Sequence, residues 1–154
     1  SRALCDELNT FQEPFESVLV HTICAITCIL RKDYNNALKC FFIAVTIAEK
    51  TSLDSFIWKS YLNIAQLYVL LGVETNYMNY KNDAVFYASE AKKILELGVL
   101  KNPELVFYIK KVLKHPLNIA NSIIYETSLK STEKDKKNCS LYINYDSYYF
   151  FLLD

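Results

Sequence analysis

The stretch YNNALKCFFIAVTIAEK, residues 34–50, carries the pattern that decides the fold. Its small residues Ala37 and Ala44 alternate with the aromatic residues Tyr34 and Phe41 at steps of three and four. That spacing collects the side chains on one face of a helix, where alanine allows a second helix axis to approach closely. We therefore predict that residues 34–50 form a helix packed tightly against a neighbouring helix.

The segment before this stretch has the same periodicity. Apolar residues recur at three- and four-residue steps from Pro14 to Leu30, which predicts a helix that is buried on more than one side. Only the polar sequence Arg31-Lys32-Asp33 separates the two predicted helices. Because this turn is so short, the two helices must lie antiparallel.

A second helix pair follows the first. We predict a third helix over residues 58–71, capped by the hydroxyl and carboxylate side chains of residues 51–55 and ended by Gly72 in a left-handed turn. After a polar loop, the pattern predicts a fourth helix over residues 82–97, ended by Gly98. The chain therefore repeats the same helix-turn-helix unit.

The remainder of the chain is less regular. Pro103 suits the first turn of a short helix and Pro116 opens another, so a third pair is predicted. We expect residues 1–130 to form one helical domain and the charged residues 131–138 to form a polar loop. The aromatic segment 139–154 is expected to pack on the helices or on a partner, either as a strand pair or as a capping helix.

The composition limits the classes of function. A chain of 154 residues with 52% hydrophobic residues can bury the core of one domain. Lys plus Arg and Asp plus Glu are balanced at 17 each, so no positive field favours direct binding of nucleic acid. The 2 glycines and 3 prolines leave too little turn chemistry for a β-sandwich. No uninterrupted apolar run is long enough for a membrane span, so we expect no membrane contact.

The five cysteines are an odd number without paired spacing, which favours a reducing compartment and predicts a cytoplasmic protein. Cys24 and Cys28 stand four residues apart, but with only His21 nearby they fall short of a four-ligand zinc site. We therefore predict no metal and no cofactor, and interpret these thiols as core residues. His21 and His115 accompany no recognisable nucleophile, and no glycine-rich phosphate loop is present, so the chain is predicted not to be an enzyme.

The repeated pair resembles the tetratricopeptide repeat, a helix-turn-helix unit of about 34 residues. The resemblance lies in the small residues Ala25 and Ala65 of the first helices, in the Tyr34-Ala37-Phe41-Ala44 order, and in Ala84, Ala88 and Ala91 of the second unit. The step of 40 residues from Ala25 to Ala65 departs from the common length and is similar to extended-repeat members. The resemblance implies an all-α fold of antiparallel pairs stacked as a short superhelix.

The resemblance also implies a binding surface. In such stacks the first helices of the units line a concave face, on which a peptide or a partner helix can lie. Asn63 is similar in placement to a groove asparagine that bonds the ligand main chain in peptide-binding members, and Lys59 and Gln66 lie one turn to either side. Thr22, Ile26 and Ile29 hold comparable places in the first unit and predict a less polar, apolar pocket. The alternative is that Asn63 faces solvent or bonds a neighbouring loop.

Three hypotheses about function follow. The first is an intracellular adaptor or sensor that captures a protein or peptide on the concave face and responds by a shift in helix stacking. The second is a structural or oligomerisation segment of a larger regulatory protein, for which self-association as a homo-oligomer remains open. An enzyme is the third hypothesis and has no constellation of residues in its support.

Overall fold

The computed structural model of the chain describes residues 13–76, 79–101 and 106–128, with side-chain surroundings for all of these except 98–101, 106–113 and 126–128. Within those ranges the regular structure is entirely α-helical, which confirms the predicted all-α class. The helices are α2 (Pro14–Leu30), α3 (Tyr34–Lys50), α4 (Asp54–Thr75), α5 (Tyr80–Lys101) and α6 (Val106–Ser128). The predicted bounds of the first two helices, 14–30 and 34–50, are those observed.

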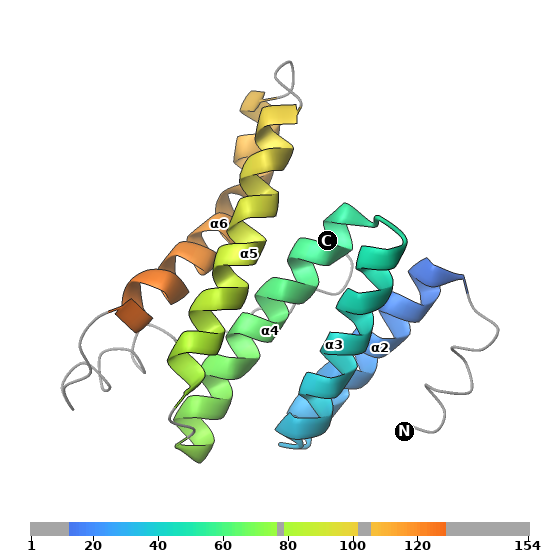
Figure 1. Cartoon of the computed structure of the whole chain (residues 1–154), viewed down its shortest axis with the longest axis vertical. Helices are drawn as coiled ribbons and strands as arrows, with labels where there is room; N and C mark the ends of the chain where they lie inside the picture. The colour runs from blue at the N-terminus through green and yellow to red at the C-terminus, as the bar shows by residue number, and fades with distance from the viewer. Residues whose placement is uncertain (1–12, 77–78, 102–105, 129–154) are drawn as a thin grey trace.

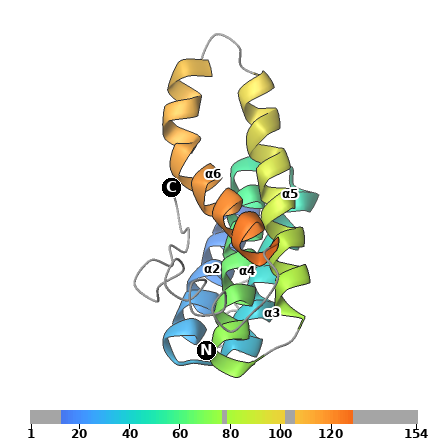
Figure 2. The same cartoon turned by 90° about the vertical axis from the view of Figure 1, so that its left-hand side faces the viewer.

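Helices that are consecutive in the chain pack against each other: α2 on α3, α3 on α4, α4 on α5 and α5 on α6 (Figure 1). Helix α4 also touches α6, although much less extensively than it touches α3 and α5. Helices α2 and α6 lie at opposite edges of the array, and α4 runs through its middle (Figure 1). Figure 2, viewed along the array from the α5–α6 side, shows that the upper parts of α5 and α6 extend beyond the other helices.

Fully buried alanines lie in the core clusters between the helices. The six alanines predicted as contact points are all fully buried at 0% exposure: Ala25, Ala37, Ala44, Ala65, Ala84 and Ala91. Two core clusters meet at α4, one shared with α2 and α3 and the other with α5 and α6. A small residue at a crossing lets the larger side chains on both sides interlock, so this prediction from the alanine spacing is confirmed.

The turns after α2 and α3 have the same geometry. In each, a residue with positive φ follows the helix: Lys32 at 61° and Ser52 at 54°. The amide of Asp33 donates to the carbonyl of Cys28 at 2.8 Å, and the amide of Leu53 donates to the carbonyl of Ala48 at 3.0 Å. Each closes the six-residue hydrogen-bonded loop of a Schellman motif, which turns the chain within three residues and makes the next helix antiparallel.

The predicted ends of α4 and α5 are wrong. Helix α4 begins after Leu53, which makes no side-chain cap, and it runs through Gly72 to end at Asn76, whose φ is 55°. Helix α5 likewise continues past Gly98 to Lys101. Gly72 is buried inside the helix, and a Cβ at this position would fall on the ring of Tyr80. The glycine therefore serves close packing of α4 on the start of α5 and does not end the helix.

The predicted break at Pro116 is also wrong, because α6 is one helix with Pro116 inside it. A proline within a helix removes one backbone hydrogen bond and bends the axis, and packing on α5 and α4 compensates for that loss. Figure 2 shows α6 changing direction along its length. The predictions for Pro103, for the loop 131–138 and for the segment 139–154 fall outside the described residues.

Candidate partner-binding surface

Lys59, Asn63 and Gln66 form a polar strip along one face of α4. They follow one another at steps of four and three residues, so their side chains leave the helix on the same side. All three are buried, with exposed fractions of 7%, 1% and 3% respectively. The structure therefore groups these three predicted site residues, but it places them inside the molecule and not on an open surface.

The sequence of α4 explains why the strip is separate from the core. Leu62, Ala65 and Val69 belong to the cluster facing α5, whereas Ile64, Leu67 and Leu70 belong to the cluster facing α3. Since these two apolar arcs occupy two sides of the helix, the polar residues are left on a third side between them. Helix α4 is thus buried on nearly its whole circumference, and three polar side chains lie on that buried surface.

Lys59 is held over aromatic rings. Its Nζ lies 5.2 Å from the ring centroid of Phe56 and 5.6 Å from that of Trp58. Phe56 is itself fixed by Phe15 of α2, whose ring meets it edge-on at a centroid distance of 5.1 Å. An ammonium group over the faces of aromatic rings is attracted by their negative potential. The cation at the start of the strip is therefore positioned by residues of both α2 and α4.

The two amides are positioned differently. Gln66 Nε2 donates a long hydrogen bond of 3.5 Å to the carbonyl oxygen of Leu62 in its own helix. Asn63 is the more deeply buried of the two, and a side-chain amide offers a donor and an acceptor together. Breaking a hydrogen bond of a buried amide costs free energy, because water does not replace the lost partner. The two amide side chains are therefore held in defined positions.

The predicted residues of α2 are placed less favourably for binding. Thr22 is 4% exposed, and its Oγ1 donates to the carbonyl oxygen of Val18 at 2.8 Å. Ile29 is 7% exposed and belongs to the core cluster with Ala37 and Phe41, so it does not line an open pocket. Ile26 is half-buried at the edge of that cluster. An apolar pocket formed by these three residues stays a prediction, with Ile26 as its most accessible member.

An aromatic cluster centred on Tyr87 was not predicted as a unit. The ring of Tyr87 on α5 stacks on Tyr61 and Tyr68 of α4, at centroid distances of 5.8 and 5.7 Å. Phe42 of α3 and Phe86 meet the same ring edge-on at 5.6 and 5.0 Å. Tyr61 and Tyr68 stand seven residues apart and therefore share a face of α4, and this spacing was the sign of the cluster that the sequence offered.

The hydroxyls of this cluster sit in an acidic setting. Tyr61 donates a hydrogen bond to the Glu49 carboxylate on α3. Burial, followed by that hydrogen bond and the charge of Glu49, raises the pKa of Tyr61 well above its ordinary value. Burial and the nearby charge of Asp83 also raise the pKa of Tyr87. Both effects keep the two hydroxyls protonated, because a tyrosinate here would be poorly solvated and close to a carboxylate.

Among the described residues, no three His, Cys, Asp or Glu side chains gather in a group that could hold a metal ion. Cys28 and Cys40 form no disulfide, whereas Cys24 is disulfide-bonded. His21 is 1% exposed; its Nδ1 lies 2.8 Å from the carbonyl oxygen of Ser17, and its Nε2 makes no hydrogen bond. His21 is thus a buried packing residue of α2 beside Ser17.

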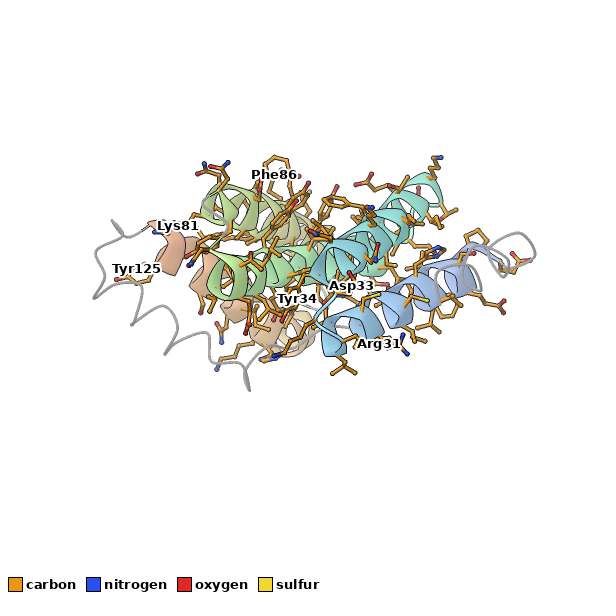
Figure 3. All side chains as sticks on the ribbon, turned by 90° about the horizontal axis from the view of Figure 1, so that it is seen from below. Arg31, Asp33, Tyr34, Lys81, Phe86 and Tyr125 are labelled. Atoms are coloured by element: carbon orange, nitrogen blue, oxygen red, sulfur yellow. The ribbon has the colours of Figure 1, made fainter. Side chains whose placement is uncertain are left out.

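Helix α2 exposes large apolar side chains at the edge of the array. Ile23 is 47% exposed and Leu30, seven residues later on the same face, is 80% exposed. Other large apolar groups are exposed singly, such as Phe86 on α5 and Tyr125 on α6, which Figure 3 shows pointing away from the helices in different directions. Two large apolar residues on one face of an edge helix form a more concentrated surface than scattered ones.

Helix α4, 22 residues long, is the one described helix long and apolar enough to cross a membrane by length and composition. Its apolar faces are packed against α3 and α5, and the core helix of a water-soluble protein passes the same test. This feature is weak evidence for a membrane span.

The fold and the strip define a class of protein, namely an array of antiparallel helix pairs with a polar face on its central helix. No family model matches the chain, and no curated protein or solved structure matches it either.

Proposed function

We propose that the chain is a tetratricopeptide-like scaffold that binds an extended peptide along the polar strip of α4. The observation that carries this proposal is the alignment of Lys59, Asn63 and Gln66 on one face of the central helix. Amide groups in a row suit the alternating donors and acceptors of a peptide backbone, and an ammonium suits a carboxylate. The preferred ligand is therefore an extended peptide with an acidic side chain or a free carboxyl end.

The burial of the strip gives the mechanism. With exposed fractions between 1% and 7%, the three side chains admit a ligand only after the groups that cover them have moved. Binding then selects a minor, opened arrangement, and the ligand shifts the population toward it. This is how a sensor converts peptide binding into a change of helix stacking.

The proposal is tested by screening the full chain against an array of random peptides and measuring affinities for the sequences retained. Lys59→Met keeps the aliphatic stem and removes the charge, so it should weaken acidic peptides at least about tenfold, the size expected for one lost charge-assisted hydrogen bond. Asn63→Asp keeps the side-chain shape and removes the NH2 donor, so it should weaken all retained peptides. The matched control is Lys39→Met on the exposed surface of α3.

Circular dichroism melts of each variant separate lost binding from lost folding. If folded Lys59→Met and Asn63→Asp proteins bind the retained peptides as tightly as the unaltered chain does, the strip is not the binding surface. If the array retains no peptide at all, the scaffold proposal itself is rejected.

A second candidate function is self-association through the edge of α2. The observation in its favour is the pair Ile23 and Leu30, exposed at 47% and 80% on one face of the outermost described helix. Stacked helix pairs extend by adding units at their edges, so a second copy of the chain fits this face. Light scattering across a concentration series should then give a mass that rises above that of one chain, and Leu30→Glu should abolish the rise. A constant monomer mass would reject this function.

The cytoplasmic location stays a prediction, and one observation weighs against it. Cys24 is disulfide-bonded, and stable disulfides are rare in reducing compartments. Quantifying the free thiols of the chain immediately after cell lysis in an alkylating agent addresses the compartment directly.

A further inference from the structure

We propose that the rings around Tyr87 form a second binding surface, whose ligand is an arginine side chain of a basic peptide. This surface, called the aromatic face below, consists of Phe42, Tyr61, Tyr68, Phe86 and Tyr87. It occupies a different side of α4 from the polar strip, so it does not depend on the proposed function.

Tyr61 and Tyr68 project from α4 nearly opposite to the polar strip. Each helical residue turns the side-chain direction by about 100°, so Asn63, two positions after Tyr61, points about 200° away from it. Tyr61 contacts Glu49 on α3 and Tyr87 on α5, which places its ring between these two helices. A ligand can therefore reach the aromatic face without the rearrangement that the buried strip requires.

The aromatic face is partly open to solvent. Four of its five rings are half-buried, and the fifth, Phe86, is 56% exposed. Phe86 meets Tyr87 edge-on at a centroid distance of 5.0 Å and points away from the helices (Figure 3). A cluster of partly exposed rings is a more concentrated surface than a single exposed ring, and the faces of aromatic rings attract cations. The rings therefore favour a ligand with a positive charge.

Carboxylates around the rings favour the same charge. Glu49 accepts the hydrogen bond of the Tyr61 hydroxyl. After burial, this bond and the charge of Glu49, the charge of Glu90 on α5 also raises the pKa of Tyr61, so Glu90 lies near the same hydroxyl. Burial and then the charge of Asp83 raise the pKa of Tyr87, which places a third carboxylate beside the face. The aromatic face thus has acidic groups from both α3 and α5 at its border.

The cations of the chain leave part of this negative charge without compensation. Glu90 pairs with Lys93 at 3.0 Å, whereas the exposed Glu49 forms no ion pair with a residue that the structure describes. Lys39, also on α3, precedes Glu49 by ten residues, and ten residues of helix advance about 15 Å. The Glu49 carboxylate is therefore available to a cation from a partner.

A guanidinium group suits this surface better than an ammonium group. It is planar, so it stacks on an aromatic ring, and its N–H groups form a fork that matches a carboxylate. A carboxylate has about four acceptor sites, so Glu49 can accept from an arginine while it still accepts from Tyr61. An arginine against Phe86 has Glu90 one helical turn away, on the same side of α5. Arginine thus combines stacking and charge in one side chain.

The surface is tested on the full chain with a short fluorescein-labelled peptide of alternating glycine and arginine, and with its lysine counterpart. Affinities are measured by fluorescence anisotropy at physiological ionic strength. We expect saturable binding of the arginine peptide, several-fold tighter than that of the lysine peptide. Absence of saturable binding overturns the proposal. Equal affinities for the two peptides overturn it as well, because the surface would then respond to charge alone.

Two variants of exposed residues locate the peptide. Glu49→Gln removes the charge and keeps the shape, so it should weaken the arginine peptide about threefold or more, as expected for one exposed ion pair. Phe86→Ala should weaken it about two- to fivefold, the size of an exposed cation–π contact. The matched controls Glu16→Gln on α2 and Tyr125→Ala on α6 should leave the affinity unchanged.

Circular dichroism melts identify the variants that remain folded. Folded Glu49→Gln and Phe86→Ala proteins that bind as tightly as the unaltered chain would overturn the proposal. An equal loss in Glu16→Gln would overturn it too, since the attraction would then come from the general charge of the surface. Lys59→Met alters only the polar strip, so it should not weaken the arginine peptide. A loss in that variant would place the peptide on the strip, which separates failure of this inference from failure of the proposed function.

Discussion

Gly72 lies inside α4 with the ring of Tyr80 against its backbone. The ring occupies the space that a Cβ at position 72 would need. Alanine at an interior helix position normally stabilises a helix by about 1 kcal/mol relative to glycine. Here the added methyl group overlaps the ring, and overpacking costs about 1–3 kcal/mol. We expect Gly72→Ala to lower the free energy of unfolding by up to about 2 kcal/mol in urea titrations, the overpacking cost less the gain in helix propensity.

The control for this prediction is the same change in a Tyr80→Ala background. Once the ring is absent, Gly72→Ala should raise the free energy of unfolding by about 1 kcal/mol, the helix-propensity gain alone. A loss of equal size in both backgrounds would mean that Tyr80 is not the cause.

Tyr61 and Tyr87 should make the free energy of unfolding depend on pH in the alkaline range. Because the folded pKa values of Tyr61 and Tyr87 are raised above the ordinary value of 10.0, the folded state binds more protons than the unfolded state above that pH. Their contribution to stability is therefore complete below about pH 10 and is lost as the pH rises through the folded pKa values. Urea midpoints measured between neutral and alkaline pH should fall above that point.

The size of the alkaline fall should depend on the Tyr61–Glu49 hydrogen bond. Tyr61→Phe cannot ionise, so it should flatten the dependence, while Tyr125→Phe, on an exposed residue of α6, should leave it unchanged. An unaltered slope in Tyr61→Phe would show that another group titrates.

At the scale of elements, the two Schellman turns give a prediction of their own. Lys32 and Ser52 have φ values of 61° and 54°, in a region that costs a non-glycine residue about 1–2 kcal/mol. Glycine adopts this conformation freely, so Lys32→Gly and Ser52→Gly should each raise the melting temperature, with a gain in stability of roughly 0.5–1 kcal/mol after the larger unfolded-state entropy of glycine is subtracted. Ser52→Val, which is β-branched, should lower it instead.

The same turns explain which helix bounds could be predicted. A polar tripeptide between two strong apolar periodicities is a local signal, so α2 and α3 were predicted to the residue. Gly72, Gly98 and Pro116 are local signals too, but tertiary contacts override them: the Tyr80 ring requires a glycine, and packing on α5 keeps α6 continuous across the proline. A single sequence does not reveal which neighbour occupies the space beside a glycine.

The polar strip was predictable for a similar reason and to a similar extent. Spacing alone places Lys59, Asn63 and Gln66 on one face, because helical periodicity is local. Their burial was not predictable, since it depends on how closely the flanking helices approach α4. The cluster around Tyr87 needed the pairing of three helices and had no local signature.

At the scale of the whole molecule, α4 joins two cores. Residues on one side of it belong to the cluster with α2 and α3, and residues on the other side belong to the cluster with α5 and α6. Opening α4 therefore dismantles both clusters, whereas an edge helix can open alone. We expect native-state amide exchange to be slowest in residues 58–70 of α4 and faster in α6, measured by mass spectrometry of peptides. Equal protection of α4 and α6 would contradict this hierarchy.

Trp58 is the single tryptophan of the chain, and its indole lies on α4 beneath the ammonium of Lys59. The fluorescence of an indole changes in wavelength and intensity when a nearby charge is displaced or when water reaches the ring. The molecule consequently carries its own optical reporter at the head of the polar strip. Any ligand that binds Lys59 should therefore shift the fluorescence emission spectrum of Trp58. The shift can be measured without a label and without knowing the identity of the ligand.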